Sequence, residues 1–299
     1  NSPFLDEIAD RKIFIKAECL QHTGSFKFRG AFSAISSIPI EKRKKGVIAY
    51  SSGNHAQGVA LAAKIHKIHA TIIMPEDAPE IKINNTRDLG AEVILYDRLN
   101  ESREKIGERI SEERLLSLIP PYDHTDVIAG QGTIGLEIAS QADENGIEKA
   151  DVLVCCGGGG LTSGIAVALS NLMPNFVTRP VEPEGFDDVV RSLKSGERQT
   201  NDKISGGLCD AIITPTPGEL TFPLMQKYCG EGIVVTDDEV MKTIALAFKR
   251  LRIVVEPGGA VALAAALFHT KSYDNETVIA VVSGGNIDPD VFRKAIEPL

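Results

Sequence analysis

One stretch decides how the chain is interpreted: Gln21-His22-Thr23-Gly24-Ser25-Phe26-Lys27-Phe28-Arg29-Gly30-Ala31-Phe32-Ser33. It follows an apolar run, residues 13–17, with the pattern of a strand. Thr23, Gly24 and Ser25 are turn and cap residue types, so we expect Lys27 in the first turn of a helix. The helix dipole there, and partial burial beside two phenylalanines, would favour the uncharged amine. Such an amine is a nucleophile that can form a Schiff base with a carbonyl cofactor, whereas a lone surface lysine is the ordinary alternative.

Three further turns of small residues each follow an apolar, strand-like run. They are Ser51-Ser52-Gly53-Asn54-His55, Gly157-Gly158-Gly159-Gly160-Leu161 and Ser283-Gly284-Gly285-Asn286. A strand, a tight turn and a helix N-terminus form an anion site, because unpaired backbone N–H groups converge there. Four glycine amides can close around a phosphate, and a helix is expected to continue over residues 161–172. The loop matches neither a Walker A motif nor Gly-x-Gly-x-x-Gly, and a glycine turn without a ligand is the alternative.

Strand-like and helix-like patterns alternate along the whole chain. The strand-like runs are residues 13–17, 47–50, 70–74, 91–95, 151–156, 177–181, 232–235 and 277–282. This alternation is typical of an α/β protein, in which helices cover both faces of parallel sheets. The least patterned stretch, residues 196–218, is expected to be a long loop, and periodicity alone marks no domain boundary.

Composition narrows the class of protein. With 299 residues, 43% of them hydrophobic, the chain can fill the cores of two domains. A net charge of −9 and a pI near 5.3 argue against nucleic-acid and anionic-membrane partners. Five cysteines without CxxC spacing predict reduced thiols and a cytoplasmic location. No apolar run reaches membrane-spanning length, and the six histidines show no zinc-ligand spacing.

The sequence resembles the threonine/serine dehydratase and serine racemase group, which are fold-type II pyridoxal phosphate (PLP) enzymes. The resemblance covers essentially the whole chain and rests on four motifs: Ser-Phe-Lys-Phe-Arg-Gly, Ser-Ser-Gly-Asn-His-Ala-Gln-Gly, Gly-Gly-Gly-Gly-Leu and Ser-Gly-Gly-Asn. Shorter matches lie at residues 120–123, 128–137 and 255–260. It implies two domains with parallel-rich twisted sheets flanked by helices. Residues 1–45 and 124–299 would form a large PLP-binding domain and residues 46–123 a small mobile domain. The cofactor would lie in the cleft between them.

The resemblance implies a cofactor contact for each matching residue. Lys27 would hold PLP covalently and then act as the base on the substrate Cα proton. Residues 157–161, which are Gly157, Gly158, Gly159, Gly160 and Leu161, would bind the phosphate through backbone amides. Asn54 would hydrogen-bond the phenolic oxygen, Phe26 would pack on the ring, and Glu256 would also lie beside the cofactor.

Ser283 would face the pyridine nitrogen of PLP. A hydroxyl there cannot keep the nitrogen protonated as a carboxylate would, so the ring is a weaker electron sink. We therefore expect β-elimination rather than transamination. The substrate carboxylate would be bound by backbone amides and short polar side chains of Ser51, Ser52, Asn54 and His55.

Three positions bear on the branch of the group. Ser52 stands where dehydratases often carry alanine and where racemases carry a serine acid/base. Glu182, Asp188 and the Phe186 carbonyl match a divalent-metal site of the racemase branch, suited to Mg²⁺ or Ca²⁺. The alternative for the two acids is a solvated helix start. Arg103 matches an arginine that meets a second substrate carboxylate, and a surface ion pair is its alternative.

The resemblance predicts a PLP-dependent ammonia-lyase that dehydrates L-serine and L-threonine to the 2-keto acid and ammonia. A serine racemase with dehydratase side activity and a 3-hydroxyaspartate dehydratase are the alternatives. A binding protein on the same fold that no longer turns over is a third. We expect a homodimer or homotetramer that binds a small amino acid. We also expect a further N-terminal segment before Asn1 and no regulatory domain after Leu299.

Overall fold

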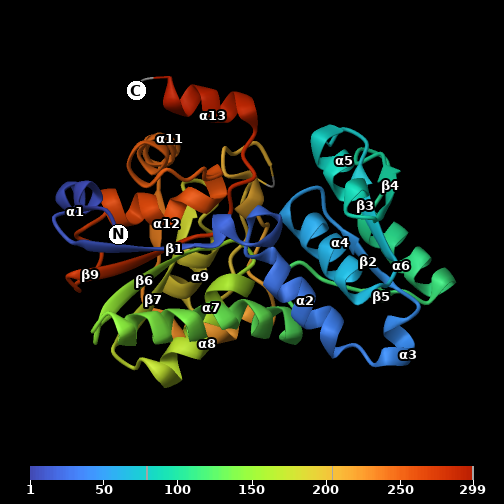
Figure 1. The fold of residues 1–299 in the computed structure, drawn as a ribbon, viewed down its shortest axis with the longest axis horizontal. Helices are drawn as coiled ribbons and strands as arrows, with labels where there is room; N and C mark the ends of the chain where they lie inside the picture. Colours follow the sequence, from blue (N-terminus) through green and yellow to red (C-terminus); the bar gives the residue numbers. More distant parts are fainter. Residues whose placement is uncertain (79, 204, 298–299) are drawn as a thin grey trace.

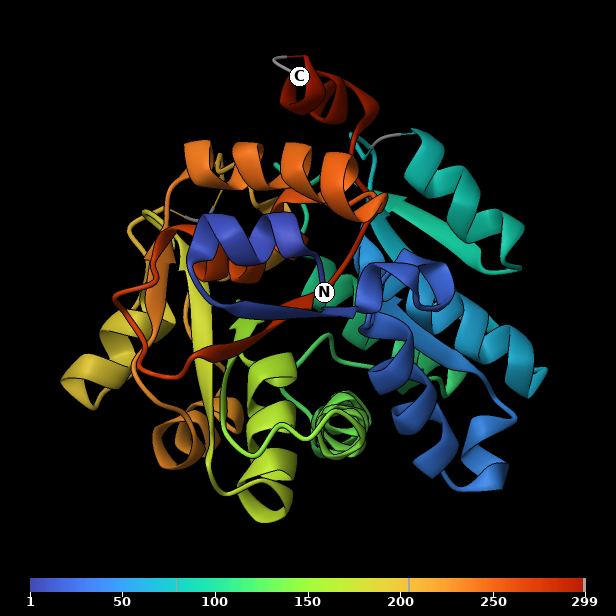
Figure 2. The same ribbon diagram turned by 60° about the vertical axis from the view of Figure 1, so that its left-hand side comes forward.

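Two parallel sheets organise the chain, and the computed structural model describes residues 1–78, 80–203 and 205–297 (Figure 1). In spatial order, the first sheet consists of β1 (Lys12–Ala17), β9 (Thr277–Val282), β6 (Ala150–Cys155), β7 (Phe176–Pro183) and β8 (Ile233–Val235). The second consists of β4 (Glu92–Tyr96), β3 (Ala70–Pro75), β2 (Val47–Tyr50) and β5 (Ser117–Leu118). Neighbouring strands within both sheets run parallel, and β1 pairs with β9 from the other end of the chain (Figure 2). The predicted α/β class is confirmed.

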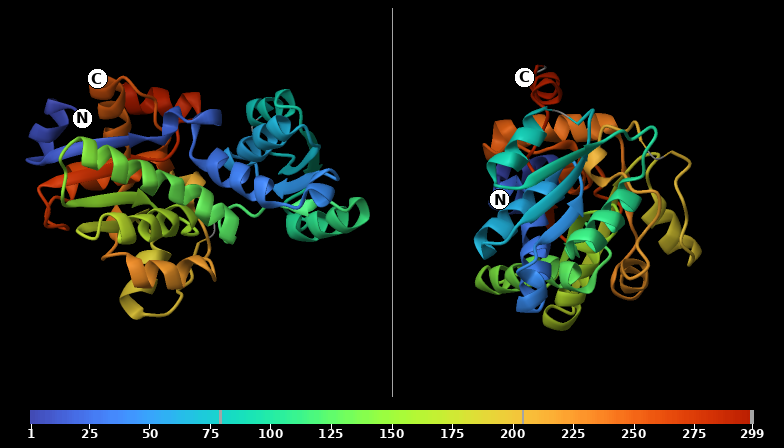
Figure 3. Two further views of the ribbon diagram at one scale, coloured as in Figure 1. Left: turned by 60° about the horizontal axis from the view of Figure 1, so that its bottom comes forward. Right: turned by 90° about the vertical axis from the view of Figure 1, so that its right-hand side faces the viewer.

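Helices flank both sheets. Those on the five-stranded side are α1 (Pro3–Ala9), α7 (Thr125–Glu144), α8 (Gly160–Leu172), α9 (Asp188–Ser195), α10 (Thr221–Tyr228), α11 (Asp237–Leu246), α12 (Pro257–Phe268) and α13 (Pro289–Ile296). Those on the four-stranded side are α4 (Asn54–His66), α5 (Glu80–Asp88) and α6 (Arg103–Arg114). Helix α2 (Lys27–Ser37) packs on both α4 and α7, so it lies between the two sheets (Figures 1 and 3). Helix α3 (Ile40–Arg43) then leads to β2.

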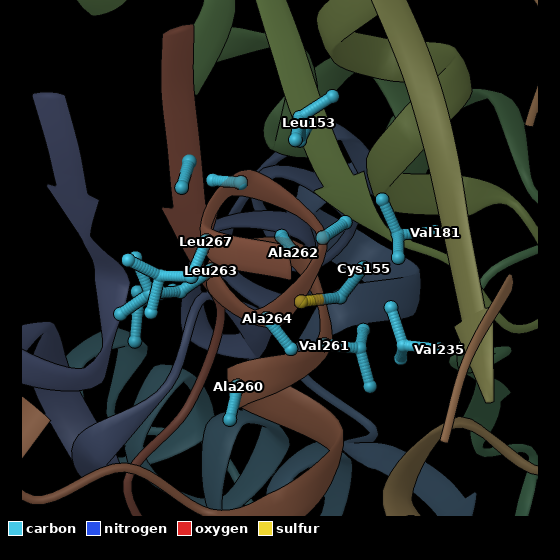
Figure 4. Close-up of a cluster of buried hydrophobic side chains, with 14 of the residues drawn as sticks. Leu153, Cys155, Val181, Val235, Ala260, Val261, Ala262, Leu263, Ala264 and Leu267 are labelled. Atoms are coloured by element: carbon cyan, nitrogen blue, oxygen red, sulfur yellow. The ribbon is translucent and has the colours of Figure 1, made fainter. Parts of the chain in front are cut away.

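The five-stranded sheet is covered on both faces because its strand residues alternate between two cores. In β6, Leu153 belongs to a cluster with α12, whereas Val152 belongs to a cluster with α8. Helix α12 is apolar all round, and its residues from Pro257 to Leu267 are buried (Figure 4). Among the described residues, no helix combines the length and the apolar character needed to cross a membrane.

Most predicted elements appear within two residues of their expected bounds. Strand β5 was not predicted, because its two residues are too short to show a period. The predicted long loop, residues 196–218, holds one 3₁₀ turn, Asp210–Ile212, within its described part. All five cysteines are unpaired, as expected from their number and spacing.

The predicted domain division agrees with the sheets but not fully with the cores. All strands of the four-stranded sheet come from within residues 46–123. However, Ala31, Ala34 and Ile35 of α2 are buried in the core of that sheet. The boundaries near residues 45 and 123, and the mobility of the smaller part, stay predictions.

Glycines bring α7 and α8 unusually close together. A Cβ on Gly132 would lie 3.0 Å from the Gly164 oxygen, and a Cβ on Gly164 would lie 2.5 Å from the Ile128 oxygen. Both contacts are with backbone atoms, which cannot swing aside as a flexible side chain can. Because α8 begins in the tetraglycine loop, this contact also places that loop relative to α7.

Gly164→Ala is therefore expected to destabilise the fold by about 1–3 kcal/mol, because overpacking outweighs the helix preference of alanine. Urea unfolding of the purified protein would measure it. Asn171→Ala, an exposed change on the same helix, serves as the control and should stay within about 0.5 kcal/mol. A Gly164→Ala protein as stable as the control would contradict the close contact.

Candidate active site

One cavity of about 280 Å³ lies where the three predicted small-residue turns come together. The turns follow β2, β6 and β9, and ligands of open α/β sheets bind at the carboxyl ends of the strands. The cavity is lined by every residue predicted to contact cofactor or substrate: Phe26, Lys27, Ser51, Ser52, Asn54, His55, Arg103, Gly157, Gly158, Gly159, Gly160, Leu161, Glu256 and Ser283. Their individual roles stay predictions, but their placement in one cavity is what those roles require.

Lys27 is the first residue of α2, as its flanking turn predicts. Its Nζ donates a hydrogen bond to the Pro121 oxygen at 2.8 Å and lies 5.2 Å from the centre of the Phe26 ring. Burial lowers the pKa of Lys27 to about 8, with the Glu256 carboxylate acting in the opposite direction. The uncharged amine, which a nucleophile or base requires, is thus far more populated near neutral pH than in an ordinary lysine.

Arg29 fixes the start of α2. Its guanidinium binds both carboxylate oxygens of Glu18 at 2.8 Å. It also binds both oxygens of Glu137 on α7, at 2.7 and 2.8 Å. These hydrogen bonds hold the pKa of Glu137 down, at about 2. Two bidentate pairs therefore tie the first turn of α2 to the 3₁₀ turn Glu18–Leu20 on one side and to α7 on the other.

The tetraglycine loop has no room for side chains. A Cβ on Gly158 would lie 2.3 Å from the Tyr122 ring, and one on Gly157 would lie 2.7 Å from the Ile212 oxygen. Gly159 has a φ of 90°, in the left-handed region that favours glycine, and it caps α8. The Thr221 hydroxyl donates to the Gly158 oxygen at 2.6 Å. The loop is thus held in one shape, with the N-terminus of α8 beside the cavity, as phosphate binding requires.

Asn54 and Glu256 form a buried polar contact beside the cavity. Asn54 Nδ2 donates to Glu256 Oε1 at 2.6 Å, and Asn286 Nδ2 donates to Asn54 Oδ1 at 2.7 Å. Burial raises the pKa of Glu256 to about 7, and the hydrogen bond from Asn54 opposes that shift. One N–H of Asn54 remains for a ligand oxygen, which is compatible with its predicted contact to the phenolic oxygen.

Ser283 is placed against the start of α2. Its backbone oxygen accepts a hydrogen bond from the Phe26 amide at 3.1 Å, and the next residue, Gly284, forms a β-bridge with Ser25. Cys155 lines the same cavity, its thiol donates to the Val281 oxygen at 3.4 Å, and burial raises the pKa of the thiol. A neutral hydroxyl and a protonated thiol are thus the groups at this wall.

The turn 51–55 places backbone amides at the start of α4. Ser51 Oγ accepts from the Gly53 amide at 3.2 Å, which closes the turn. The His55 ring is buried, its Nε2 lies 2.8 Å from the Ile119 oxygen, and burial lowers its pKa to about 3. The His55 ring is therefore neutral and already bonded. Its expected contribution to carboxylate binding thus falls to the backbone amide in the first turn of α4.

Arg103, the first residue of α6, reaches the cavity but is not free. Its guanidinium lies 5.3 Å from the centre of the Tyr50 ring, and its Nε donates to Glu104 Oε1 at 2.8 Å. The side chain is 50% exposed. Arg103 thus lines the cavity and forms a surface ion pair, and its contact with a second substrate carboxylate stays a prediction.

The predicted metal ligands lie apart from this cavity, at the end of β7 and the start of α9. The Glu182 carboxylate accepts from the amides of Val189 and Val190 at 3.2 and 2.7 Å. Asp188 Oδ1 accepts from Asn201 at 2.6 Å, whereas Asp188 Oδ2 is buried without a partner. Burial raises the pKa of both acids, and the Asp188 charge raises that of Glu182 further. Two buried carboxyl groups with one unpartnered oxygen fit a cation.

Phe186 lies in the turn between the two acids, and its amide donates to the Pro183 oxygen at 3.1 Å. Within the part of the chain that the structure describes, no group of three or more His, Cys, Asp or Glu side chains is arranged to hold a metal. A site here would therefore need the Phe186 carbonyl, as predicted, or water as further ligands.

Several cavity residues were not predicted. They are Tyr50, Lys82, Pro121, Tyr122, Gln131, Cys155 and residues 210–214. Tyr122 and Gln131 fall within the short motifs 120–123 and 128–137, from which they could have been predicted as cavity residues. Lys82 and residues 210–214 come from a polar helix and an unpatterned loop, which carry no such signal.

Comparison with known proteins agrees with this geometry. Residues 1–284 match the family model described as pyridoxal-phosphate dependent enzyme. The chain is 41% identical to an L-threo-3-hydroxyaspartate ammonia-lyase of Pseudomonas sp, over 98% of this chain and 90% of that protein. It is also 41% identical to a serine racemase of Schizosaccharomyces pombe, over 93% of this chain and 84% of that protein. The crystal structure of a T.th. threonine deaminase superposes with a TM-score of 0.90 at 40% identity, covering 96% of this chain and 91% of that one.

The relatives differ in their named activities, and the family model matched by this chain covers the Lys27 turn and the tetraglycine loop. The chain therefore belongs to the fold-type II PLP-dependent enzymes of the threonine/serine dehydratase and serine racemase family.

Proposed function

We propose that the protein is an ammonia-lyase that dehydrates L-serine and L-threonine. The observation that carries this proposal is the Lys27 amine, with its pKa lowered to about 8, in one cavity with the turn 51–55 and Ser283. An amine that can be neutral at working pH can remove a proton, and the turn offers amides to a carboxylate.

Each group of cavity residues has a separate role in this reaction. PLP, when bound, supplies the electron sink that stabilises the carbanion formed at Cα. The amides of residues 157–161 hold its phosphate, and the turn 51–55 orients the substrate carboxylate. Lys27 removes the Cα proton, and the Ser283 hydroxyl faces the ring without a charge. The β-hydroxyl then takes up one proton and leaves as water, and hydrolysis of the resulting enamine by another water gives the 2-keto acid and ammonia.

The ion pair of Arg103 favours serine and threonine over 3-hydroxyaspartate. Arg103 Nε already donates to Glu104 Oε1 at 2.8 Å, so a second substrate carboxylate would have to compete with that acid. The Pseudomonas relative named for 3-hydroxyaspartate keeps this substrate as the second candidate.

Serine racemisation is the third candidate, since the Schizosaccharomyces pombe relative is named a serine racemase. Racemisation needs a proton donor on the face of the cofactor opposite Lys27, and Ser52 is the residue we propose for it. We also propose a divalent cation, Mg²⁺ or Ca²⁺, on Glu182, Asp188 and the Phe186 carbonyl. A homodimer or homotetramer and a cytoplasmic location stay predictions.

Lys27→Ala should abolish keto-acid formation from L-serine and L-threonine. It should also prevent borohydride from fixing the cofactor to the chain, because the amine is lost. Keto-acid release and peptide mass measure the two effects, with the exposed Lys44→Ala as the control. Near-normal turnover by Lys27→Ala would overturn the proposed function. A wild-type protein that binds PLP but turns over neither amino acid would support the binding-protein alternative.

Ser52→Ala should separate the two reactions. Elimination from an L-amino acid needs only the base on the Lys27 side, whereas L-to-D conversion also needs the opposite donor. Loss of a general acid costs roughly 10²–10⁴-fold, so conversion and activity on D-serine should fall by about that factor. L-Threonine dehydration should largely remain. Parallel assays of D-amino acid and keto acid test this, and an equal loss of both would assign Ser52 to carboxylate binding or architecture.

Chelation should lower the thermal stability of the protein, and Mg²⁺ or Ca²⁺ should restore it. A ligand that binds only the folded state stabilises it by roughly 2.7 kcal/mol at a hundredfold excess over its dissociation constant. Glu182→Gln should remove this response, whereas Glu184→Gln, at an exposed neighbour, should keep it. A melting temperature unaffected by EDTA in the wild type would return Glu182 and Asp188 to buried acids without a metal.

A further inference from the structure

An ion pair joins residues from the two sides of the active-site cavity. Lys82 comes from α5, beside the four-stranded sheet, and Asp210 comes from the 3₁₀ turn Asp210–Ile212, on the five-stranded side. Both line the cavity, and Lys82 Nζ lies 3.9 Å from Asp210 Oδ2. Charge-assisted hydrogen bonds are shorter, about 2.7–2.9 Å, so the two charges are close without being locked together.

The pair lines the same cavity as Glu256 and the turn 51–55. Asp210 raises and Lys82 lowers the pKa of Glu256, so both charges are within electrostatic reach of that carboxyl group. Glu256 in turn accepts the hydrogen bond of Asn54, which lies in the turn 51–55 and is the first residue of α4. An amino acid held by that turn therefore has Lys82 and Asp210 in its surroundings.

Two of the cationic side chains of the cavity are paired with acids. Its described lining contains three lysine and arginine side chains: Lys27, Lys82 and Arg103. Lys27 is the proposed base, Arg103 is paired with Glu104, and Lys82 faces Asp210. Of the two pairing acids, Asp210 itself lines the cavity, and its side chain is 72% exposed. An incoming group can thus meet the Asp210 charge directly.

We propose that Asp210 is a specificity-determining residue that neutralises Lys82 and repels a second carboxylate on the substrate. The cavity would then select amino acids whose β-substituent is uncharged, and would accept dicarboxylic amino acids poorly. This proposal rests on the proposed function, because it concerns the substrate of the same site. It makes a surface loop without sequence pattern responsible for the choice between serine and 3-hydroxyaspartate.

The test compares L-aspartate with L-alanine, which differ only in the β-carboxylate. Neither carries a β-hydroxyl, so neither can lose water, and binding to the holoenzyme is measured from the cofactor absorbance. Asp210→Asn should improve the affinity for L-aspartate relative to L-alanine by roughly tenfold, because like charges no longer oppose each other. Lys82→Met should shift the ratio in the opposite direction. Asp143→Asn makes the same charge change at an exposed position on α7 and should leave the ratio unchanged.

An unchanged ratio in Asp210→Asn, or a shift against L-aspartate, would overturn the proposal. Because the ratio is taken within one protein, a general loss of affinity or of folded protein cancels. The measurement needs no turnover. A wild type that fails to dehydrate serine would therefore refute the proposed function, and the ratio of the two affinities could still be interpreted. Where dehydration occurs, selectivity between L-serine and 3-hydroxyaspartate should move in the same direction as the binding ratio.

Discussion

The site depends on keeping one amine buried, and the Arg29 ion pairs make that possible. A lysine at the first position of a helix experiences an unfavourable dipole, and burial adds to the cost of its charge. Left mobile, such a side chain would turn to solvent and regain its charge. Arg29 prevents this by binding Glu18 and Glu137 bidentately, which fixes the first turn of α2 between two elements. The single hydrogen bond from Lys27 to the Pro121 oxygen then sets the direction of the amine.

The second constraint is the space around the tetraglycine loop. Tyr122 lies against Gly158, and Ile212 lies against Gly157. The segment before α7 and the 3₁₀ turn Asp210–Ile212 thus both pack on the tetraglycine loop. Any side chain at these glycines would push those segments outward and open the cavity. The glycines let the cavity wall approach closely, and the absence of side chains also leaves their amides open to an anion, as the proposed phosphate contact requires.

Local signals explain what the sequence predicted well. The position of Lys27 at a helix start, the strand that precedes the glycines and the α8 helix all follow from residues adjacent in the chain. The other residues proposed to contact cofactor or substrate came from the resemblance: most from the four motifs, Glu256 from the match at 255–260 and Arg103 from its own segment. All of them line the cavity. Strand β5 was missed because two residues show no period, and it is defined only by pairing with β2. The Arg103–Glu104 pair was likewise foreseen only as an alternative, since orientation toward a cavity is a tertiary property.

Lys82 and Asp210 show why substrate preference is harder to predict than chemistry. Lys27 and the amides proposed to bind anions lie in short motifs. A turn, a cap and a helix start must be contiguous in the chain to form an anion site or to place a lysine at a helix start. The groups around the β-substituent face no such requirement. They need only reach the cavity, and here they come from residues 128 positions apart, on α5 and on the loop before α10. A single acid on that loop can therefore alter the charge presented to the substrate while Lys27, the glycines and Ser283 stay as they are. Relatives that are 40–41% identical to this chain carry the names of a hydroxyaspartate ammonia-lyase, a serine racemase and a threonine deaminase.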